Sequence, residues 1–561
     1  MSTYVLGINI GHDQGAAIIK DGEVLGAIAQ ERINRIKHTA SVNPPFEAID
    51  YLLDYFKLDI SDISYMGVTS TAVYIEELEQ YVRDMIKHHY HYCPTVIPFT
   101  HHLAHAASAY FTSDFDNAIA IVADGGGENV GNHEESESIF LCNCGTIKLL
   151  ERRLQSNYFH ALSRPQNYIK PFMNPALFHD QISIGKKYSQ ITNLLGFGNN
   201  GAGKTMGLAG YGRHKFTLPV QSIDGEFGFQ LQFDSIISEV YSEYEKTGRN
   251  YVDFYNEHSA DIAYCVQHYT EQQVIEIVRY CIKKYNCKQF VLAGGVFLNC
   301  PVNHKLLETF PDITIHICPA AGDEGQALGA AFLAYYQQVE TVKKNSRFSP
   351  FLGRDYSNSD IQRFLDRIQA NYTFLDNNEL VDYISDQLSI NKVVGIFRGR
   401  SEFGPRALCH RSILANPTTS WMKDYLNKEV KHREMFRPFA PVVIAEDQRT
   451  YFELLQESPY MLLSTQVRPE YADDLPAIVH VDGSARIQAV TKASDPFMHD
   501  MLLRFSKVSG YPILLNTSFN DRGEPIVESP HDAYHAFVNM KIDILILENF
   551  VIKKNDLNSD D

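Results

Sequence analysis

The sequence predicts an α/β protein of more than one domain, and three observations lead to this prediction. The chain has 561 residues, which exceeds the roughly 100–200 residues of an ordinary domain. A pattern of short apolar runs and turns near the start returns about a hundred residues later. From residue 261 onward, helix-like and strand-like segments alternate.

The opening segment predicts three strands. Apolar residues fill 4–10, 16–20 and 24–29, and Asp21-Gly22 is a hairpin signal between the second and third runs. The later copy places strands over 118–123, 138–142 and 147–150, with a loop at 124–127 and a turn at 144–145. A strand that ends in a Gly and Asp loop lets backbone amides approach a phosphate while a carboxylate holds its metal. Two such units resemble the duplicated core of the actin, heat-shock ATPase and sugar-kinase superfamily.

The rest of the chain predicts a helix over 261–285, a strand over 289–293 and a helix over 325–336. A polar stretch over 342–359 carries Pro, Gly, Ser and Asn without a clear period, so we place a domain boundary there. The expected domains are 1–345 and 346–561. In the second, strands are expected over 393–398, 440–444, 513–516 and 542–547.

Composition narrows the function classes. The chain has 50 Lys and Arg against 68 Asp and Glu, a net charge of −18, which disfavours general binding to nucleic acid or to anionic membranes. The start lacks a signal-peptide pattern, and no apolar run approaches 18 residues. Nine scattered cysteines fit buried thiols in a reducing compartment. We therefore expect a cytoplasmic protein with no nucleic-acid or membrane partner.

Two histidines predict a metal site. Residues 100–110 are rich in Ala and favour a helix, which would place His101 and His105 on one face, four residues apart. Asp124 and Asp323 could complete a set of two imidazoles and two carboxylates, which favours iron(II) or manganese over a zinc thiolate site. The alternative is that both histidines make ordinary hydrogen bonds.

Two glycine-rich segments suggest phosphate contacts. Residues 198–205 match the sequence pattern of a P-loop. A P-loop must follow a strand, which residues 191–196 would have to form. The fold that contains P-loops is also unlike the duplicated hairpins upstream. We therefore expect a glycine-rich nucleotide contact in another fold. Gly294 and Gly295 follow a strand. They could let a phosphate or ribose approach closely, or they could form a plain tight turn, and the sequence fits both interpretations equally well.

The second domain contains a group of cations that the net charge does not reveal. Such a group could bind phosphates in bidentate fashion, although a solvated basic face is the alternative for members such as Arg433. The cations are Lys392, Arg398, Arg400, Arg406, Arg411, Lys431, Arg433 and Arg437.

Eight motifs occur in one order across nearly the whole chain: HHLAHAASAY, the Asp124 loop, GKTMGLAGYG, GGVFLN, GDEGQALGAA, GRSEFGPRALCHRS, KHREMFRPFAP and LNTSFNDRGEPIVESP. Together they resemble the O-carbamoyltransferase family of antibiotic and Nod-factor biosynthesis. Cys409 departs from the family pattern, in which Gly is common at that position.

The resemblance implies a fold and a reaction. The N-terminal domain would resemble the universal tRNA threonylcarbamoyl transferase, and the C-terminal domain would be YrdC-like. The YrdC-like domain would convert carbamoyl phosphate and ATP, the latter with Mg²⁺, into carbamoyl adenylate, releasing pyrophosphate and phosphate. The N-terminal domain would then transfer the carbamoyl group to a substrate hydroxyl and release AMP.

The resemblance also implies residue roles. His101, His105, Asp124 and Asp323 would hold the metal, with iron(II) favoured, and His101 and Asp124 would count as catalytic together with the general base His12. Lys37 would contact phosphate. The adenylate would lie against Lys204, Gly207, Gly294, Gly295 and Asn299. In the second domain, carbamoyl phosphate and ATP would be held by Lys431, Arg437, Arg486, Asn516, Ser518 and Arg522.

Two other functions stay open at this point. One is a tRNA threonylcarbamoyl-type transferase, which the net charge of −18 disfavours. The other is an ATPase or regulatory binding module of the same superfamily. The acceptor is expected to be a small hydroxylated molecule, with a slight preference for a cationic one, and a homodimer is left open.

Overall fold

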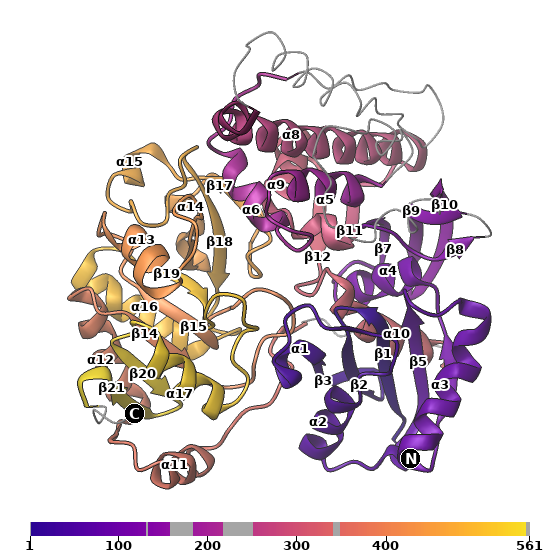
Figure 1. The fold of residues 1–561 in the computed structure, drawn as a ribbon, viewed down its shortest axis with the longest axis horizontal. Coiled ribbons are helices and arrows are strands. Elements are labelled where there is room, and N and C mark those ends of the chain that lie inside the picture. The colour runs from indigo at the N-terminus through magenta and orange to yellow at the C-terminus, as the bar shows by residue number, and fades with distance from the viewer. Residues whose placement is uncertain (1, 131–132, 157–182, 217–250, 340–347, 557–561) are drawn as a thin grey trace.

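The computed structural model describes residues 2–130, 133–156, 183–216, 251–339 and 348–556. Figure 1 shows the N-terminal region in indigo to pink and the C-terminal region in orange to yellow, side by side. The predicted boundary between residues 345 and 346 lies outside the described residues. Within the described part of the chain, no helix combines the length and the apolar character needed to cross a membrane.

The N-terminal region contains two sheets with the same strand arrangement. In the first, three antiparallel strands continue into two parallel ones in the order β3-β2-β1-β5-β6, with β4 paired to β1. Its strands are β1 (Tyr4–His12), β2 (Gly15–Lys20), β3 (Glu23–Ala29), β4 (Ala40–Ser41), β5 (Ile63–Ser70) and β6 (Thr95–Pro98).

The second sheet repeats this plan in the order β10-β9-β7-β11-β12, with β8 paired to β9. Its strands are β7 (Asn117–Ala123), β8 (Asn129–Val130), β9 (His133–Asn143), β10 (Thr146–Ser156), β11 (Gln289–Ala293) and β12 (Thr314–Ile317). The hairpin turns also correspond, because Asp21-Gly22 and Cys144-Gly145 all have positive φ. The predicted duplication, and with it the actin-like and sugar-kinase-like fold class, is confirmed.

Two helices lie between these sheets. α10 (Gln326–Tyr336) packs on β1 and β5, α4 (His101–Phe111) packs on β7 and β11, and the two helices pack on each other. Small residues allow this close approach: a Cβ on Gly7 would lie 2.0 Å from the carbonyl oxygen of Ala327, and one on Gly329 would lie 1.9 Å from that of Ala104. The backbone of α4 is thereby fixed at the centre of the region.

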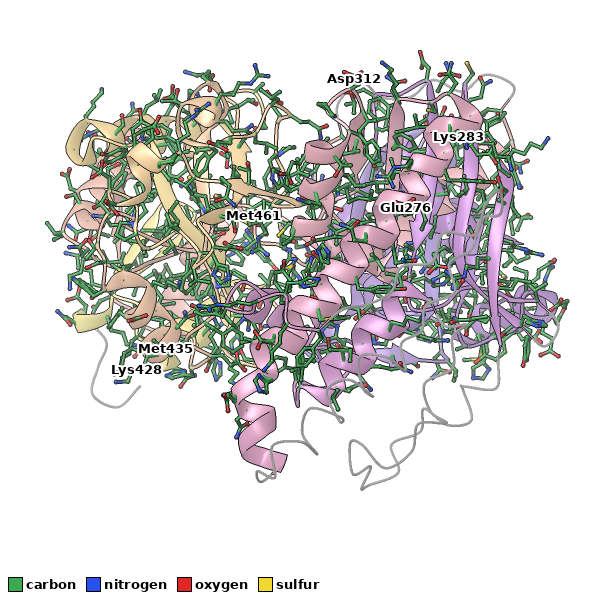
Figure 2. The ribbon with its side chains drawn as sticks, turned by 90° about the horizontal axis from the view of Figure 1, so that it is seen from above. Glu276, Lys283, Asp312, Lys428, Met435 and Met461 are labelled. Atoms are coloured by element: carbon green, nitrogen blue, oxygen red, sulfur yellow. The ribbon has the colours of Figure 1, made fainter. Side chains whose placement is uncertain are left out.

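The remaining N-terminal helices lie outside the pair of sheets. α2 and α3 pack on the first sheet, and α8 packs on the second. These helices are α1 (Gln30–Asn34), α2 (Phe46–Phe56), α3 (Ile75–Tyr90), α5 (Ile184–Leu194), α6 (Ala202–Ala209), α8 (Tyr251–Tyr285) and α9 (Cys300–Thr309). Glu276 and Lys283 mark α8 in Figure 2.

The C-terminal region is a nine-stranded mixed sheet in the order β13-β21-β20-β14-β15-β19-β16-β18-β17. Its strands are β13 (Thr373–Phe374), β14 (Val394–Phe397), β15 (Arg411–Ala415), β16 (Ala440–Ile444), β17 (Leu463–Gln466), β18 (Ser484–Val490), β19 (Ile513–Ser518), β20 (Ile544–Leu547) and β21 (Phe550–Lys553).

Helices cover both faces of this sheet. α12 (Asn377–Ser389) and α16 (Pro496–Ser509) cover one face, and α11 (Asn358–Arg367) and α17 (Pro530–Asn539) cover the other. Shorter helices are α13 (Met422–Tyr425), a π-helical turn (Leu426–Val430), α14 (Gln448–Tyr451) and α15 (Pro469–Ala472). The four predicted C-terminal strands are all present, with small differences at their ends.

Polar contacts join the two regions. Glu528 accepts a 2.6 Å hydrogen bond from the hydroxyl of Tyr51 and lies 3.9 Å from the guanidinium of Arg32, and both side chains of that ion pair are buried. Asn303 of α9 donates to the carbonyl of Leu462 over 2.8 Å. Figure 2 shows the nearby Met461 where the two regions meet. Buried polar contacts of this kind fix the regions in one relative orientation.

Candidate functional site

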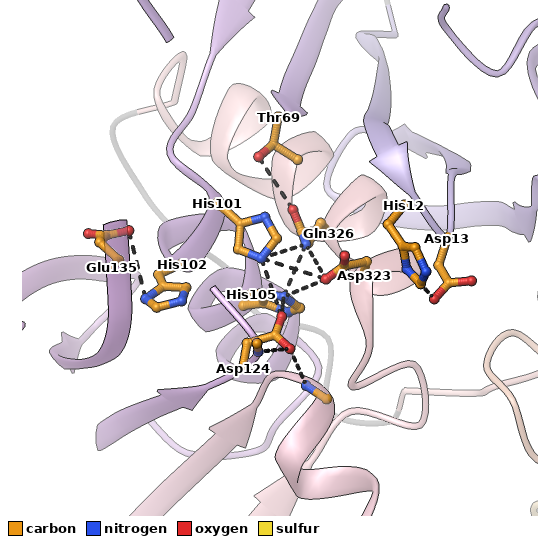
Figure 3. A network of polar contacts seen from close by, with 12 residues as sticks. His12, Asp13, Thr69, His101, His102, His105, Asp124, Glu135, Asp323 and Gln326 are labelled. Atoms are coloured by element: carbon orange, nitrogen blue, oxygen red, sulfur yellow. Dashed lines mark hydrogen bonds and ion pairs between the residues drawn. The ribbon is translucent and has the colours of Figure 1, made fainter. Parts of the chain in front are cut away.

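Helix α4 carries both predicted imidazole ligands on one face. His101 and His105 are four residues apart, and their side chains are 1% and 0% exposed. Asp124 follows β7, and Asp323 lies in the turn that precedes α10. Each element therefore brings one or two ligand atoms to the crossing point of α4 and α10, as Figure 3 shows.

The four side chains lie at distances that suit ligands of one ion. Nε2 of His105 is 3.2 Å from an oxygen of Asp124 and 3.2 Å from one of Asp323, and the corresponding distances from Nε2 of His101 are 3.3 and 3.6 Å. Two ligand atoms, each about 2.1 Å from an ion, lie about 3.0–3.4 Å apart at angles of about 90–110°. The chemistry of the set, two nitrogens and two carboxylate oxygens, fits a divalent transition metal.

The charges of this cluster are strongly coupled. Burial alone would lower the pKa of His105, but its hydrogen bonds to Asp124 and Asp323 outweigh burial and raise that pKa to about 9. Burial would raise the pKa of Asp124, whereas hydrogen bonds from both histidines hold it well below its usual range. The carboxylate is therefore ionised at neutral pH, which metal coordination requires.

A second polar group lies beside the cluster. Asp13 accepts a 2.8 Å contact from Nδ1 of His12 through one oxygen and a 3.0 Å contact from Nδ1 of His38 through the other. Figure 3 shows His12 on the Asp323 side of the cluster. The hydrogen bond to Asp13 outweighs burial and raises the pKa of His12 to about 9. The predicted general base thus has an acidic partner that orients its ring.

The predicted glycine-rich contacts occupy two different places. Gly295 donates its N–H to Oδ1 of Asp124 at 3.3 Å, so the Gly294-Gly295 turn adjoins the His and Asp cluster. Asn299, in contrast, caps α9 by accepting from Val302 and exchanges hydrogen bonds with Gln267. Its amide is thus engaged within the N-terminal region.

Helix α6 lies against the C-terminal region. Lys204 pairs with Glu434 at 2.9 Å, and the carbonyl of Gly207 accepts from Nε2 of His480 at 3.0 Å. In this structure the Lys204 side chain and the Gly207 carbonyl are therefore engaged with the C-terminal region, and their contact with an adenylate stays a prediction. The strand that a P-loop would need over 191–196 is absent, because α5 runs to Leu194.

Two of the residues predicted to bind carbamoyl phosphate and ATP, Lys431 and Ser518, contact each other, and two others contact neighbouring residues. The Lys431 ammonium donates to the carbonyl of Ser518 and to Oδ1 of Asn520, both at 2.8 Å. Asn516 donates to Gln488 at 2.8 Å and to Ala407 at 3.2 Å. In this conformation Lys431 and Asn516 hold the strand and loop around Ser518, while Arg522 lies at the exposed end of that loop and donates to the carbonyl of His432.

A group of five cations lies where the two regions meet, and we call it the interdomain cation group. Burial lowers the pKa of every member, although each keeps some contact with water. Repulsion from neighbouring cations lowers four of these pKa values further, to about 9 for Arg406. The members are Lys37, Arg406, Arg433, Arg437 and Arg486.

Sequence reasoning assigned roles to only three of these five cations. For Arg433 a solvated face is the alternative to phosphate binding, and Arg406 belongs to the basic group without a role of its own. Arg406 donates a 3.0 Å hydrogen bond to the carbonyl of Leu298, next to the predicted Asn299 contact, and so links the cation group to the N-terminal region. The Nε atoms of Arg406 and Arg486 are buried without a hydrogen-bond partner among the described residues. An anion would satisfy both.

Comparison with protein families places both regions in one family. Residues 4–92 and 70–332 match the model described as Carbamoyltransferase N-terminus, and residues 385–554 match Carbamoyltransferase C-terminus. Nodulation protein NolNO of Sinorhizobium fredii is 31% identical and covers 98% of this chain and 80% of its own length.

Other proteins match to different extents. An uncharacterised protein of Synechocystis is 32% identical over 98% of this chain and 97% of its own length. Nodulation protein U of Rhizobium tropici is 37% identical over 42% of this chain and 39% of its own length. Among solved structures, full-length HypF in a phosphate- and nucleotide-bound form covers 61% of this chain and 56% of its own length, with 15% identity and a TM-score of 0.42.

Proposed function

Because this chain belongs to the carbamoyltransferase family, we propose that it is an ATP-dependent O-carbamoyltransferase with two reaction centres. One observation carries the proposal. The interdomain cation group brings five cations together, with unpartnered guanidinium nitrogens on two of them, and a separate His and Asp cluster is suited to a divalent ion. A cationic site and a metal site fit the formation of an anionic intermediate at one and its use at the other.

The C-terminal region, which we take to be YrdC-like, would carry out adenylation. Water hydrolyses carbamoyl phosphate to carbamate and phosphate, and a carbamate oxygen then attacks the α-phosphorus of ATP and displaces pyrophosphate. We expect Arg437 and Arg486 to neutralise the phosphates, because guanidinium groups bind phosphate through two parallel hydrogen bonds. Binding of the nucleotide with Mg²⁺ would also relieve the repulsion within the interdomain cation group.

The N-terminal region would transfer the carbamoyl group. An acceptor hydroxyl attacks the carbamoyl carbon, AMP leaves, and Nε2 of His12 takes the hydroxyl proton while Asp13 holds its Nδ1. Iron(II) or another divalent ion held by His101, His105, Asp124 and Asp323 would polarise the carbamoyl oxygen, and its charge would lower the pKa of His12. We expect Lys37 and the Gly294-Gly295 turn to contact the adenylate.

The acceptor is proposed to be a hydroxylated small molecule. The net charge of −18 supports a cationic acceptor and speaks against nucleic acid. A cytoplasmic location is consistent with the absence of a membrane-crossing helix in the described residues. The homodimer stays a prediction.

Pyrophosphate release from ATP tests the proposal before any acceptor is known. The full-length protein, loaded with a divalent metal, is incubated with Mg²⁺ and ATP, with and without carbamoyl phosphate. We expect release only when carbamoyl phosphate is present. Equal release with ATP alone would indicate an ATPase, and no release from folded, metal-loaded protein would contradict adenylation.

A further inference from the structure

The amide of Gln326 lies within the His and Asp cluster, and neither the motif resemblance nor the family match assigns it a role. Gln326 is the first residue of α10, three positions after Asp323, and its side chain is buried. Its Nε2 atom lies 3.0 Å from Nε2 of His105, 3.3 Å from Nε2 of His101 and 2.8 Å from Oδ1 of Asp323. Figure 3 shows the amide between these three groups and Thr69.

These distances place the end of Gln326 at a further corner of the coordination polyhedron that the four ligand atoms would form around an ion. The distances to the two histidine nitrogens lie within the range of about 3.0–3.4 Å expected between atoms that share one ion at about 2.1 Å, and the 2.8 Å distance to Asp323 is slightly shorter. An atom at the ion's own position would lie much closer to each histidine nitrogen. The terminal atom of Gln326 is therefore a neighbour of the four ligand atoms around a common centre.

With its nitrogen in that position, the amide cannot be satisfied in either protonation state of the histidines. If Nε2 of His101 and His105 both accept from Gln326, neither nitrogen carries a proton for Asp124 or Asp323, although each lies within 3.6 Å of both carboxylates. If Nε2 is protonated toward Asp124 and Asp323, two donors face each other. In addition, one NH₂ group with two hydrogens faces three acceptors.

Turning the amide over removes this conflict. The oxygen would then face the cluster, and the NH₂ group would face Oγ1 of Thr69, which now donates to Gln326 Oε1 over 3.4 Å. A hydroxyl both donates and accepts, so Thr69 serves either orientation. A carboxamide oxygen is a hard ligand of the kind that accompanies carboxylates around divalent cations.

We infer that Gln326 is a fifth protein ligand of the divalent ion, binding through Oε1 after its amide turns toward the cluster, with Thr69 accepting from the freed NH₂ group. This inference rests on the proposed function for the presence of the ion. It adds a neutral oxygen to two imidazoles and two carboxylates, and the net charge of the site is unchanged. Because Gln326 occupies one coordination position of the ion, it reduces the number of positions at which a substrate oxygen can bind.

Cobalt(II) binding tests the inference without any catalytic turnover. The full-length protein and the variants Gln326→Leu and Gln326→Glu are titrated with Co²⁺, and the visible absorption and X-ray absorption spectra are recorded. Leucine fills a similar volume and leaves little room for a replacing water. Gln448→Leu is the matched control, because Gln448 is also buried but bonds the carbonyls of Leu454 and Gln456 in the C-terminal region.

We expect Gln326→Leu to weaken Co²⁺ binding by about 10- to 100-fold and to remove one oxygen scatterer, with stronger visible bands as the coordination number falls. Gln326→Glu should restore the scatterer, and Gln448→Leu should match the wild type. If Gln326→Leu binds less tightly but has the wild-type spectrum, Gln326 acts only by positioning Asp323 and the inference is wrong. An unchanged affinity and spectrum would also overturn it.

The same samples separate this inference from the proposed function. Pyrophosphate release dependent on carbamoyl phosphate reports on the C-terminal reaction and does not require Gln326. A protein that binds Co²⁺ through Gln326 but does not form carbamoyl adenylate would contradict the proposed function alone. A wild-type protein that binds no Co²⁺ would overturn the fifth ligand, even if adenylation is observed.

Discussion

Oδ2 of Asp13 lies 2.8 Å from Nδ1 of His12, and this contact is the main reason why the pKa of His12 is raised to about 9. The same carboxylate has its own pKa lowered to about 2, because hydrogen bonds from His12 and His38 outweigh its burial. The backbone of Asp13 has a φ of 44°, an uncommon value for a residue other than glycine. The carboxylate is therefore held between two imidazoles at some cost in backbone energy.

The sign of the pH dependence follows from these two shifts. The pKa of His12 is higher in the folded chain than its usual 6.5, so its contribution to stability is complete below about pH 6.5 and is lost as the pH rises through about 9. The pKa of Asp13 is lower in the folded chain than its usual 3.8, so its contribution is present above that value and is lost as the pH falls toward about 2. Between these limits the pair is ionised and stabilising.

Replacing Asp13 by Asn should lower the pKa of His12. Without the carboxylate, we expect the midpoint of His12 to move from about 9 toward 6.5, and the rising limb of the transfer rate against pH to move the same way. NMR titration of the metal-free protein, with the His12 signal assigned by its loss in His12→Asn, measures this midpoint. A midpoint that stays near 9 would show that Asp13 does not set it.

Replacing Asp124 by Ala should separate the two half-reactions. Asp124 lies 3.3 and 3.2 Å from the two histidines of α4, so its loss removes one ligand and leaves both imidazoles without this partner. We expect carbamoyl transfer to fall by about 100-fold or more while pyrophosphate release stays close to wild type. His101→Ala should behave alike.

The exposed Asp386, which pairs with Arg504 on the surface of the C-terminal region, provides a matched control for Asp124. Asp386→Ala should leave both half-reactions unchanged. Loss of pyrophosphate release in Asp124→Ala would show that the two reactions do not belong to separate sites.

Replacing Arg486 by Leu should stabilise the ligand-free protein and abolish adenylation. The Arg486 guanidinium is surrounded by protein and adds to the repulsion that lowers the pKa values of Arg406, Arg433 and Arg437. Removing an uncompensated cation from such a site should raise the free energy of unfolding by about 1 kcal/mol or more. Urea unfolding without ligands and pyrophosphate release measure the two effects.

Pyrophosphate offers a second measurement on the interdomain cation group. It should raise the unfolding temperature of the wild type and have a much smaller effect on Arg486→Leu. The control Arg363→Leu removes an exposed cation paired with Asp360 on α11, and its stability should change by no more than about 0.5 kcal/mol. A destabilised Arg486→Leu without ligands would contradict the repulsion argument.

Local patterns predicted most of the fold. Continuous apolar runs and the turns Asp21-Gly22 and Cys144-Gly145 predict the hairpins of both sheets, because strands buried on both faces and turns with positive φ are encoded by neighbouring residues. The spacing of His101 and His105 likewise predicted a shared helix face. Cys409 is informative in the same way: its φ of 82° explains why glycine suits this position.

Long-range contacts could not be predicted in this way. Lys204 follows a glycine-rich run that suggests a phosphate contact, but the packing of α6 places it 2.9 Å from Glu434 of the C-terminal region. Asp13 and His38 are 25 residues apart and meet only because β1 and the segment after α1 fold side by side. The sequence does contain a signal that Gln326 belongs to the site. Gln326 follows Asp323 by three residues at the start of a helix, so the two side chains share one helix face.

Replacing Gly329 by Ala should damage the fold and the metal site together. The new Cβ would lie 1.9 Å from the carbonyl oxygen of Ala104 and 3.0 Å from the amide nitrogen of Ser108, so α10 and α4 would have to move apart. Overpacking of this kind costs about 1–3 kcal/mol, and we expect the upper end because the obstructing atoms are backbone.

The displaced helix is the one that carries His101 and His105, so Co²⁺ affinity should fall in the same variant, Gly329→Ala. The control is Gly203→Ala in α6, where the added Cβ meets nothing within 4 Å and the exchange should stabilise by about 0.4–1 kcal/mol. The two substitutions are chemically identical, so opposite signs in urea unfolding would locate the effect at the crossing of α4 and α10. A Gly329→Ala protein with wild-type stability and Co²⁺ affinity would contradict the close packing on which the metal site depends.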